Sequence, residues 1–353
     1  MPGLTAPLSA STVPFPGDVP THPLLVIDHS LIQAHDPEEL DRLWEAATQL
    51  GFWYLKNHGL DEEVARMFDV CAEAMDLPLE EKMRFEIGDD GNLFGYKARG
   101  TIATDKNGTR DNVEFLDIAQ DDAFSWPVVT HRTYPSVVTT HMADTFTPFM
   151  RKSAAVNAIF LTVFETRLGL PAGTFAALHD PARPNGGEAR CIRTPPHQNS
   201  AGVGAHTDFG SLAIVNNRLG GLQVMPPGTD QWLYIKPVPG YAICNIGDTL
   251  AIFSAGILRS NVHRVMPPPG AQSQFPRYSV SFFTRPGSDI RLRALCEESS
   301  LIAEAAAKAP EGLYDPGVTA REWLMRRVRN LRRKNREGWL DSQGTEHEGA
   351  KGH

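Results

Sequence analysis

His206 and Asp208 stand two positions apart, and His263 follows further along the chain. Side chains at i and i+2 of a strand point to the same face of a sheet, so His206 and Asp208 are expected to reach one point together while Thr207 points away. Two imidazoles and one carboxylate form the three-point set that holds non-haem Fe(II) and leaves its other coordination positions open. This mixed set of imidazoles and a carboxylate suits Fe(II), whereas zinc prefers thiolate or His-rich sets. The three residues are therefore a candidate iron site.

Arg277 and Ser279 form a second pair with the same spacing. On a strand, the guanidinium and the hydroxyl project together, and such a pair can hold a carboxylate through charge-assisted hydrogen bonds. The planar Arg fork also orients the group that it binds. A dicarboxylate co-substrate of a neighbouring metal would need this anchor. Each motif alone occurs often by chance, so the interpretation depends on their order, their spacing and their setting.

The segment that carries these residues has the texture of a β-structure. From about residue 188, short apolar runs are separated by Pro, Gly and Asn at close intervals, which is typical of an antiparallel sandwich or jelly roll. Apolar residues at helical spacing predict helices over 38–50, over 61–76 with Asp61 as the N-cap, over 136–168, and again from about 299. We predict an α+β fold with a double-stranded β-helix (jelly-roll) core flanked by N-terminal and C-terminal helices.

The same pass along the chain predicts its organisation. We expect a disordered leader, an N-terminal region of helices and strands, a helical segment, the jelly-roll core that carries the candidate iron site, and C-terminal helices with a loose tail. The corresponding ranges are 1–22, 23–125, 126–187, 188–290 and 291–353.

Composition excludes several classes of protein. The formal net charge of −8 over 353 residues argues against general affinity for nucleic acid or anionic membranes. The basic run 326–334 is interpreted as the solvated face of a C-terminal helix. Four widely spaced cysteines without a CxxC motif indicate a reducing compartment, and the N-terminus shows no signal peptide, so we expect a cytoplasmic protein. No apolar run approaches the ~18 residues that a membrane span needs.

Several motifs resemble the 2-oxoglutarate- and Fe(II)-dependent oxygenases of the isopenicillin-N-synthase-like family, over roughly residues 22–290. In the core, the segments that resemble family motifs are Ala205-His206-Thr207-Asp208-Phe209-Gly210, Asn245-Ile246-Gly247-Asp248, Ser260-Asn261-Val262-His263-Arg264-Val265 and Arg277-Tyr278-Ser279-Val280-Ser281-Phe282-Phe283. Those in the N-terminal half are Gly51-Phe52-Trp53-Tyr54, Asn57-His58-Gly59, Pro78-Leu79-Glu80-Glu81-Lys82 and Gly95-Tyr96.

The resemblance implies a 2-oxoglutarate-dependent dioxygenase with Fe(II) as its metal and 2-oxoglutarate and O2 as co-substrates. His206, Asp208 and His263 would bind the iron, while Arg277 and Ser279 would bind the far carboxylate of 2-oxoglutarate. The expected reaction is oxidation of a small organic molecule in specialised metabolism, by hydroxylation, desaturation or demethylation, with release of succinate and CO2. Two alternatives remain: an iron-dependent oxidase of the same family that does not use 2-oxoglutarate, and a non-catalytic β-barrel binding protein.

The resemblance also places a substrate pocket. Arg190, Phe115, Asp117 and Phe283 fall where relatives line it, and Phe283 shares the strand face of the Arg-Ser pair by parity. Arg190 in a pocket favours an anionic or carbonyl-bearing substrate. Arg190 as a surface side chain and Phe115 as an ordinary core residue are the competing interpretations.

Some features depart from the family pattern or lie outside it. Thr194 stands where relatives usually have a tyrosine that helps to hold the co-substrate, so the secondary co-substrate contacts stay open. Four other histidines are interpreted as structural: His58, His131, His179 and His197. We expect the protein to be a monomer.

Overall fold

The computed structural model describes residues 13–196 and 202–335, and its strands form two sheets. The larger sheet has eight strands in the order β1-β2-β10-β7-β12-β5-β4-β3, and the smaller has four in the order β6-β11-β8-β9. Only β1 and β2 pair in parallel; the other paired strands of both sheets run antiparallel. The strands are β1 (Val26–Asp28), β2 (Phe52–Lys56), β3 (Gly95–Lys97), β4 (Glu114–Ala119), β5 (Glu188–Thr194), β6 (Val203–His206), β7 (Leu212–Asn217), β8 (Leu222–Val224), β9 (Leu233–Tyr234), β10 (Ala242–Ile246), β11 (His263–Val265) and β12 (Arg277–Thr284).

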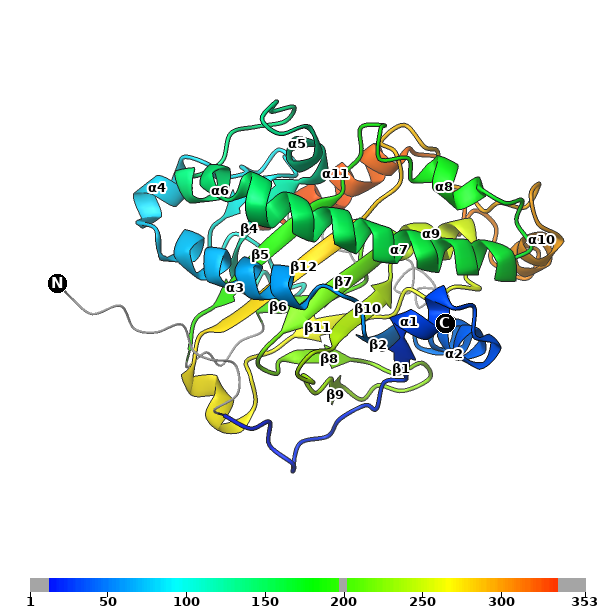
Figure 1. Cartoon of the computed structure of the whole chain (residues 1–353), viewed down its shortest axis with the longest axis horizontal. Coiled ribbons are helices and arrows are strands. Elements are labelled where there is room, and N and C mark those ends of the chain that lie inside the picture. Colours follow the sequence, from blue (N-terminus) through cyan, green and yellow to red (C-terminus); the bar gives the residue numbers. More distant parts are fainter. Residues whose placement is uncertain (1–12, 197–201, 336–353) are drawn as a thin grey trace.

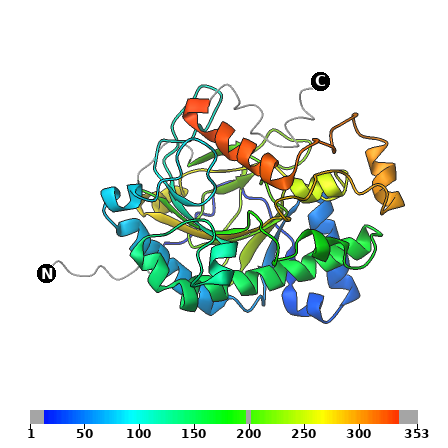
Figure 2. The same cartoon turned by 90° about the horizontal axis from the view of Figure 1, so that it is seen from above.

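The helices form the outer layers of the molecule. They are α1 (His29–Gln33), α2 (Pro37–Gln49), α3 (Asp61–Asp76), α4 (Leu79–Met83), α5 (Gln120–Ser125), α6 (Ser136–Thr140), the π-helix η1 (Met142–Phe146), α7 (Thr147–Arg167), α8 (Thr174–Leu178), α9 (Asp248–Phe253), the 3-10 helix η2 (Gly270–Gln274), α10 (Ser300–Ala306) and α11 (Ala320–Leu331). In Figure 1, α3 and α7 cross one face of the large sheet. The view from above shows α11 on the opposite side from α7 (Figure 2). The sheets therefore lie between two helical layers, which is the predicted α+β arrangement around a β core.

The two faces of the large sheet differ in character. On β12, Val280 and Phe282 are completely buried and pack with Phe149 of α7 in one apolar cluster. Further along the sheet, Trp53 of β2 meets Phe160 of α7 with ring centroids 5.6 Å apart. Burial of side chains of this size stabilises the fold by about 1.5–3 kcal/mol each. Because strand side chains alternate, Arg277, Ser279, Ser281 and Phe283 face the other way, toward the smaller sheet and the candidate site.

The smaller sheet packs on this second face. Leu222 and Val224 of β8 belong to one buried cluster with Phe52 of β2 and Ile243 of β10. The ring of Phe52 also meets the imidazole of His263 edge to face, with centroids 5.2 Å apart. The candidate histidine is therefore held against the large sheet by apolar packing.

Helix boundaries were predicted well where the caps are local. The helix expected over 38–50 is α2, where the Asp36 side chain accepts a hydrogen bond from the Glu39 N–H and Pro37 occupies the first turn. The helix over 61–76 is confirmed as α3. Its predicted N-cap is wrong, because Asp61 is the first helical residue and Leu60 occupies the cap without a side-chain hydrogen bond.

The long helix expected over 136–168 is divided into α6, η1 and α7. Pro148 lies at the start of α7, and proline has no N–H to donate to the preceding turn. The wider π turn before it lets the Thr147 N–H bond the carbonyl of Met142 instead. The chemistry of proline thus accounts for the interruption.

The N-terminal segment corrects part of the predicted disordered leader. Residues 1–12 lie outside the described residues, but residues 13–22 run along β9 and η2. The His22 N–H donates to the Tyr234 carbonyl at 3.0 Å, and the ring of Phe15 lies 6.2 Å from that of Tyr234. Backbone pairing and aromatic packing therefore order this part of the segment. The last part of the predicted loose tail, 336–353, also lies outside the described residues.

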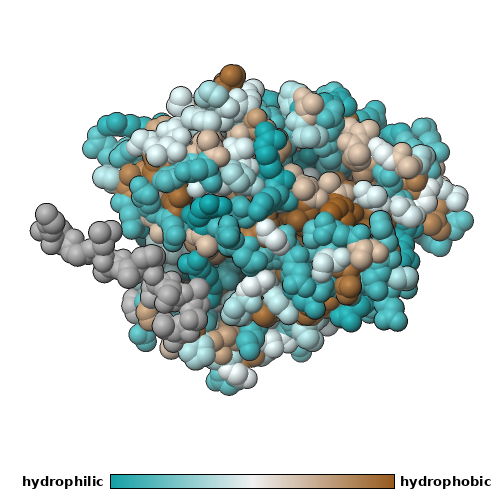
Figure 3. Space-filling model, in the orientation of Figure 1, coloured by the Kyte–Doolittle hydropathy of each residue, from teal (hydrophilic) through white to brown (hydrophobic). Residues whose placement is uncertain are grey.

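The basic run at the C-terminus is a second correction. Arg327 and Arg332, at 0% and 2% exposure, are buried in ion pairs, whereas Arg329 and Lys334 are exposed as predicted. The helix therefore turns part of its charged run inward. Figure 3 shows the α7 side of the molecule, where apolar residues appear as separate patches among hydrophilic ones. Among the described residues, no helix is long and apolar enough to cross a membrane.

Candidate metal centre and substrate pocket

The structure brings together the three residues predicted to bind a metal. His206 ends β6, Asp208 follows two residues later, and His263 begins β11 directly opposite His206. Each imidazole Nε2 lies 3.8 Å from Asp208 Oδ1, and one ligand atom from each residue falls within 4.8 Å of the others. This is the one such cluster of His, Cys, Asp and Glu within residues 13–196 and 202–335. Thr207 points away, as expected, and is fully buried.

Neighbouring groups leave the right atoms available for a cation. His206 Nδ1 lies 2.9 Å from the Gly204 carbonyl, and His263 Nδ1 lies 3.2 Å from the Asn261 carbonyl. Each Nδ1–H can donate to its carbonyl, which leaves the Nε2 lone pair for a metal. The Asn245 side chain donates to Asp208 Oδ2 at 2.7 Å, so Oδ1 is the oxygen that remains. The residues present thus fit an Fe(II) ion.

The local electrostatics keep His206 and Asp208 in their metal-binding forms. Burial and the neighbouring His263 lower the pKa of His206 to about 3. Burial alone would raise the pKa of Asp208, but the two imidazoles and the Asn245 amide outweigh it, so this pKa lies below its ordinary value. Neutral imidazoles and an ionised carboxylate are the forms that bind divalent metals.

Arg277 and Ser279 lie together on β12, as their spacing predicts. Arg277 donates through Nε to the Gly220 carbonyl at 2.7 Å and through Nη2 to Asn217 Oδ1 at 2.9 Å, and the Ser279 hydroxyl donates to the same Asn217 oxygen at 2.5 Å. Arg277 is only 2% exposed, and among the described residues no carboxylate lies within ion-pair distance of it. Burial lowers the pKa of Arg277 to about 10. A buried guanidinium without a counter-ion is costly, and an anionic ligand would offset that cost.

Thr194 lies beside this anchor. It is directly opposite Arg277 in the pairing of β5 with β12, and its buried hydroxyl has no hydrogen-bond partner among the described residues. The position that departs from the family pattern therefore still presents a polar group next to Arg277.

The four residues predicted to line the substrate pocket also lie together. Arg190 pairs with Asp117 in two contacts, Nε to Oδ1 at 2.6 Å and Nη2 to Oδ2 at 3.0 Å, and its Nη2 also donates to Glu188 at 2.8 Å. Its guanidinium carbon lies 4.3 Å from the ring centroid of Phe115 and 5.1 Å from that of Phe283. Burial raises the pKa of the Asp117 carboxyl to about 8 while the Arg190 guanidinium opposes the rise. Arg190 is therefore a pocket residue, not a surface arginine.

A cavity of about 100 Å³ connects this cluster to the metal-type residues. His206, Asp208 and Arg190 line it on one side, and α11 contributes an apolar wall on another. The wall residues are Leu324, Val328 and Leu331, which follow helical spacing along one face. Arg277 and Ser279 do not line this cavity; they lie further along the β12 face that carries Phe283.

Sequence reasoning missed several residues around the site. Asn245 and Asp248 are in a segment recognised only as a family signature. Both directly contact the metal strand, which comprises β6 and the next two residues, Thr207 and Asp208. Glu188 carried a readable signal, since it stands two positions before Arg190 on β5 and therefore shares its face. Arg327 carried a readable signal, since it falls on the same helical face as Trp323 and Leu324.

Three of the four histidines interpreted as structural make contacts with protein groups. His58 accepts a hydrogen bond from the Leu60 N–H at 3.1 Å, and His131 contacts Asp121 at 2.9 Å. His179 bridges the Phe175 carbonyl and the Ser211 hydroxyl at 2.8 and 2.7 Å. His197 lies outside the described residues.

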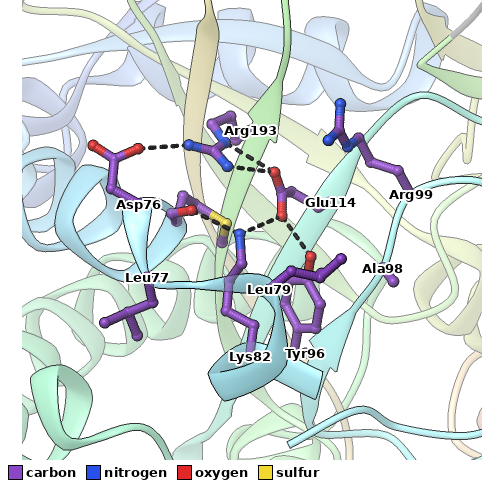
Figure 4. Close-up of a pocket in the computed structure, with 10 residues that line it drawn as sticks. Asp76, Leu77, Leu79, Lys82, Tyr96, Ala98, Arg99, Glu114 and Arg193 are labelled. Atoms are coloured by element: carbon purple, nitrogen blue, oxygen red, sulfur yellow. Dashed lines mark hydrogen bonds and ion pairs between the residues drawn. The ribbon is translucent and has the colours of Figure 1, made fainter. Parts of the chain in front are cut away.

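A second hollow, of about 540 Å³, lies on the opposite face of the same strands. In Figure 4, Lys82, Tyr96 and Arg193 all point toward the carboxylate of Glu114. Arg193 also reaches Asp76 at 2.6 Å. The donors of this network are satisfied within it, and none of its residues belongs to the metal-type cluster.

Comparison with known proteins identifies the class of protein that this fold and site define. Residues 187–286 match the model of the 2OG-Fe(II) oxygenase superfamily, and residues 24–138 match that of the non-haem dioxygenase in morphine synthesis N-terminal region. The chain belongs to the 2-oxoglutarate- and Fe(II)-dependent oxygenases of the isopenicillin-N-synthase-like family.

Individual relatives cover most of the chain. The 2-oxoglutarate-dependent dioxygenase frbH of Dothideomycetidae sp. is 29% identical over 77% of this chain and 84% of its own length. A homoarginine-6-hydroxylase of Glycine max is 28% identical over 79% of this chain and 89% of its own. Among solved structures, a 2OG-Fe(II) oxygenase family protein of Caulobacter crescentus has a TM-score of 0.71 and 27% identity over 88% of this chain and 100% of its own. The rice dioxygenase for auxin oxidation shares the fold, with a TM-score of 0.61 and 23% identity over 78% of this chain and 87% of its own.

These findings confirm the predicted α+β jelly-roll class and the enzyme class. The protein is a 2-oxoglutarate-dependent dioxygenase that uses Fe(II), 2-oxoglutarate and O2 to oxidise a small molecule. Neither alternative, the oxidase that does not use 2-oxoglutarate or the non-catalytic binding protein, is favoured.

Proposed function

We propose that His206, Asp208 and His263 hold the Fe(II) of this dioxygenase. The observation that carries the proposal is the convergence of one ligand atom from each residue within 4.8 Å, with His206 and Asp208 at the wall of the cavity. Bound iron, with 2-oxoglutarate and O2, supplies the oxidising chemistry and releases succinate and CO2. The protein orients the participants and excludes water from them.

Arg277 and Ser279 bind the far carboxylate of 2-oxoglutarate in this proposal. Support comes from the buried guanidinium of Arg277, which lacks a carboxylate partner among the described residues. The Ser279 hydroxyl donates to the same Asn217 oxygen as Arg277 and so lies beside it. Thr194 is proposed as a secondary contact, because its unpartnered hydroxyl lies opposite Arg277.

Arg190, Phe115, Asp117 and Phe283 form the substrate end of the pocket. Of the two substrate characters expected for Arg190, the structure favours a carbonyl-bearing molecule over an anion. The Nε and Nη2 atoms of Arg190 already bind Asp117 and Glu188, so the fork that a carboxylate would use is occupied. Nη1 has no partner among the described residues and suits a single carbonyl oxygen. The two flanking phenyl rings suit a small, largely apolar substrate.

Hydroxylation is the proposed outcome, with desaturation and demethylation as the other members of the set. The soybean relative is named a hydroxylase of homoarginine, which supports this choice. We also propose a cytoplasmic monomer of specialised metabolism. The unpaired thiols of Cys71, Cys191, Cys244 and Cys296 fit a reducing compartment. The morphine-synthesis name of the N-terminal model supports the metabolic assignment.

A matched substrate screen tests the pocket assignment. Pairs of small ring compounds of equal size, one bearing a neutral carbonyl and one a carboxylate, are compared by succinate formation above the substrate-free rate. The carbonyl members are expected to stimulate more, and Arg190→Met should lower their kcat/KM by about 10–100-fold. Arg193→Met is the control, since Arg193 lies on the same strand but faces the hollow of Figure 4. Preference for the carboxylates, or an Arg190→Met enzyme as active as the Arg193→Met enzyme, would contradict the assignment.

A further inference from the structure

Arg327 on α11 forms a fully buried ion pair with Asp248 at the start of α9. Both side chains are 0% exposed, and Nη1 of Arg327 contacts Asp248 Oδ2. Taking two charges out of water is costly, so a buried pair of this kind requires good geometry and further hydrogen bonds. The pair connects the C-terminal helix to a segment that lies beside the candidate metal strand.

The same two residues contact each residue of Thr207-Asp208-Phe209. Arg327 Nη2 donates to the Thr207 carbonyl at 3.2 Å, and the Thr207 hydroxyl donates to Asp248 Oδ2 at 3.0 Å. The Asp248 N–H donates to the Asp208 carbonyl at 2.8 Å, and the guanidinium carbon of Arg327 lies 4.3 Å from the Phe209 ring centroid. The backbone around Asp208 is therefore held by two residues that do not themselves line the cavity.

Gly247 makes this close approach possible. A Cβ at Gly247 would collide with the Gly210 carbonyl, so a larger residue would push α9 away from the metal strand. With glycine there, the Asp248 and Thr249 N–H groups reach the carbonyls of Asp208 and Gly210. The contact of α9 with the strand thus depends on a residue without a side chain.

We infer that Arg327 is a positioning residue for the metal centre. It fixes the orientation of Thr207, the residue between the two ligands of the HxD pair, and so sets the angle at which His206 and Asp208 point into the cavity. The inference rests on the proposed assignment of these two residues as ligands. Groups that orient metal ligands from outside the coordination sphere typically change metal affinity by about 10–100-fold when removed.

The same helix forms part of the substrate pocket. Leu324, three positions before Arg327, and Val328, the next residue after it, line the cavity. Helix α11 therefore contacts the metal strand through Arg327 and lines the substrate pocket through Leu324 and Val328. A shift of α11 on substrate binding would be transmitted to the metal strand through the Arg327 contacts.

Lysine is a poor substitute at this position. A guanidinium offers donors in a planar fork, so Arg327 contacts Asp248 and the Thr207 carbonyl at the same time. An ammonium group on a flexible chain keeps the charge but loses this geometry. Arg327→Lys should therefore retain the ion pair and lose much of the orientation.

Co(II) binding to the apo-enzyme tests the inference without requiring turnover. Arg327→Met is expected to weaken Co(II) binding by about 10–100-fold and to change the visible absorption of the bound ion, and Arg327→Lys by a smaller factor. The double variant Arg327→Met with Asp248→Asn removes both charges, so its metal affinity is measured without an unpaired buried carboxylate. Folding is monitored by circular dichroism and the Tm.

Lys82→Met is the matched control. Lys82 is also buried and ion-paired, with Glu114 at 2.8 Å, but it lies in the network of Figure 4 away from the metal strand. It should lower the Tm without changing Co(II) affinity. Folded Arg327 variants that bind Co(II) with the affinity and spectrum of the wild type would overturn the inference. Asp208→Ala separates this failure from that of the proposed function: if Asp208→Ala also keeps wild-type affinity, the ligand assignment itself is wrong.

Discussion

His263 lies directly opposite His206 in the antiparallel pairing of β11 with β6, and their imidazole centroids are 4.3 Å apart. Residues far apart in the chain thus become neighbours through strand register alone. Slipping an antiparallel pairing by one residue moves every side chain to the other face. The pairing of β6 with β11 is therefore as important to the metal centre as the identity of the three ligands.

The co-substrate anchor yields the first prediction. Arg277→Ala should weaken 2-oxoglutarate binding by about 10–100-fold, because a hydrogen-bonded ionic contact of about 1.5–3 kcal/mol is lost. Ser279→Ala should cost about 3–10-fold, since it removes one neutral donor. Both are measured by 2-oxoglutarate titration of the Co(II)-loaded protein. Arg218→Ala is the control, because this neighbouring guanidinium stacks on Phe68 instead. Equal affinities for Arg277→Ala and Arg218→Ala would rule out the anchor.

Asn217 gives a second prediction. Its Oδ1 accepts hydrogen bonds from both Arg277 and Ser279. Asn217→Asp would place a carboxylate against Arg277 and satisfy its charge from within the protein. The Tm is expected to hold or rise, while the KM for 2-oxoglutarate rises by about 10–100-fold as the anchor becomes occupied. An Asn217→Asp enzyme with an unchanged KM would show that Arg277 does not bind the co-substrate.

The period-2 rule explains why so much of the site was predictable. Parity alone indicated that His206 and Asp208 reach one point together and that Phe283 shares the face of Arg277 and Ser279, and the structure has both arrangements. These are local statements, and local geometry is what a sequence encodes most directly.

The surroundings of Arg190 could not be predicted in the same way. Asp117 meets Arg190 only because β4 and β5 pair with these two residues opposite each other. No short-range pattern encodes that register. The guanidinium of Arg190, expected to favour an anionic or carbonyl-bearing substrate, consequently already uses its Nε and Nη2 donors within the protein. The ion pair of Arg327 is similar: its helical face could be read from the sequence, but its partner Asp248 comes from a distant helix.

Stability should depend on pH through His179. The imidazole bridges Phe175 and Ser211, and burial lowers its pKa to about 4. The unfolded chain, with an ordinary pKa near 6.5, binds the proton more readily. The contribution is therefore complete above pH ~6.5 and is lost as the pH falls toward 4, by up to about 3 kcal/mol. Urea unfolding at several pH values should show a smaller decline for His179→Gln. An identical decline in both proteins would exclude His179 as its source.

Asp208→Ala tests the central claim most directly. With Fe(II), 2-oxoglutarate and O2, the wild-type enzyme should form one succinate for each 2-oxoglutarate consumed. Asp208→Ala should remain folded by circular dichroism and form none, because the one carboxylate of the ligand set is gone. Succinate formation by folded Asp208→Ala at the wild-type rate, or O2 consumption by the wild type without succinate, would contradict the account.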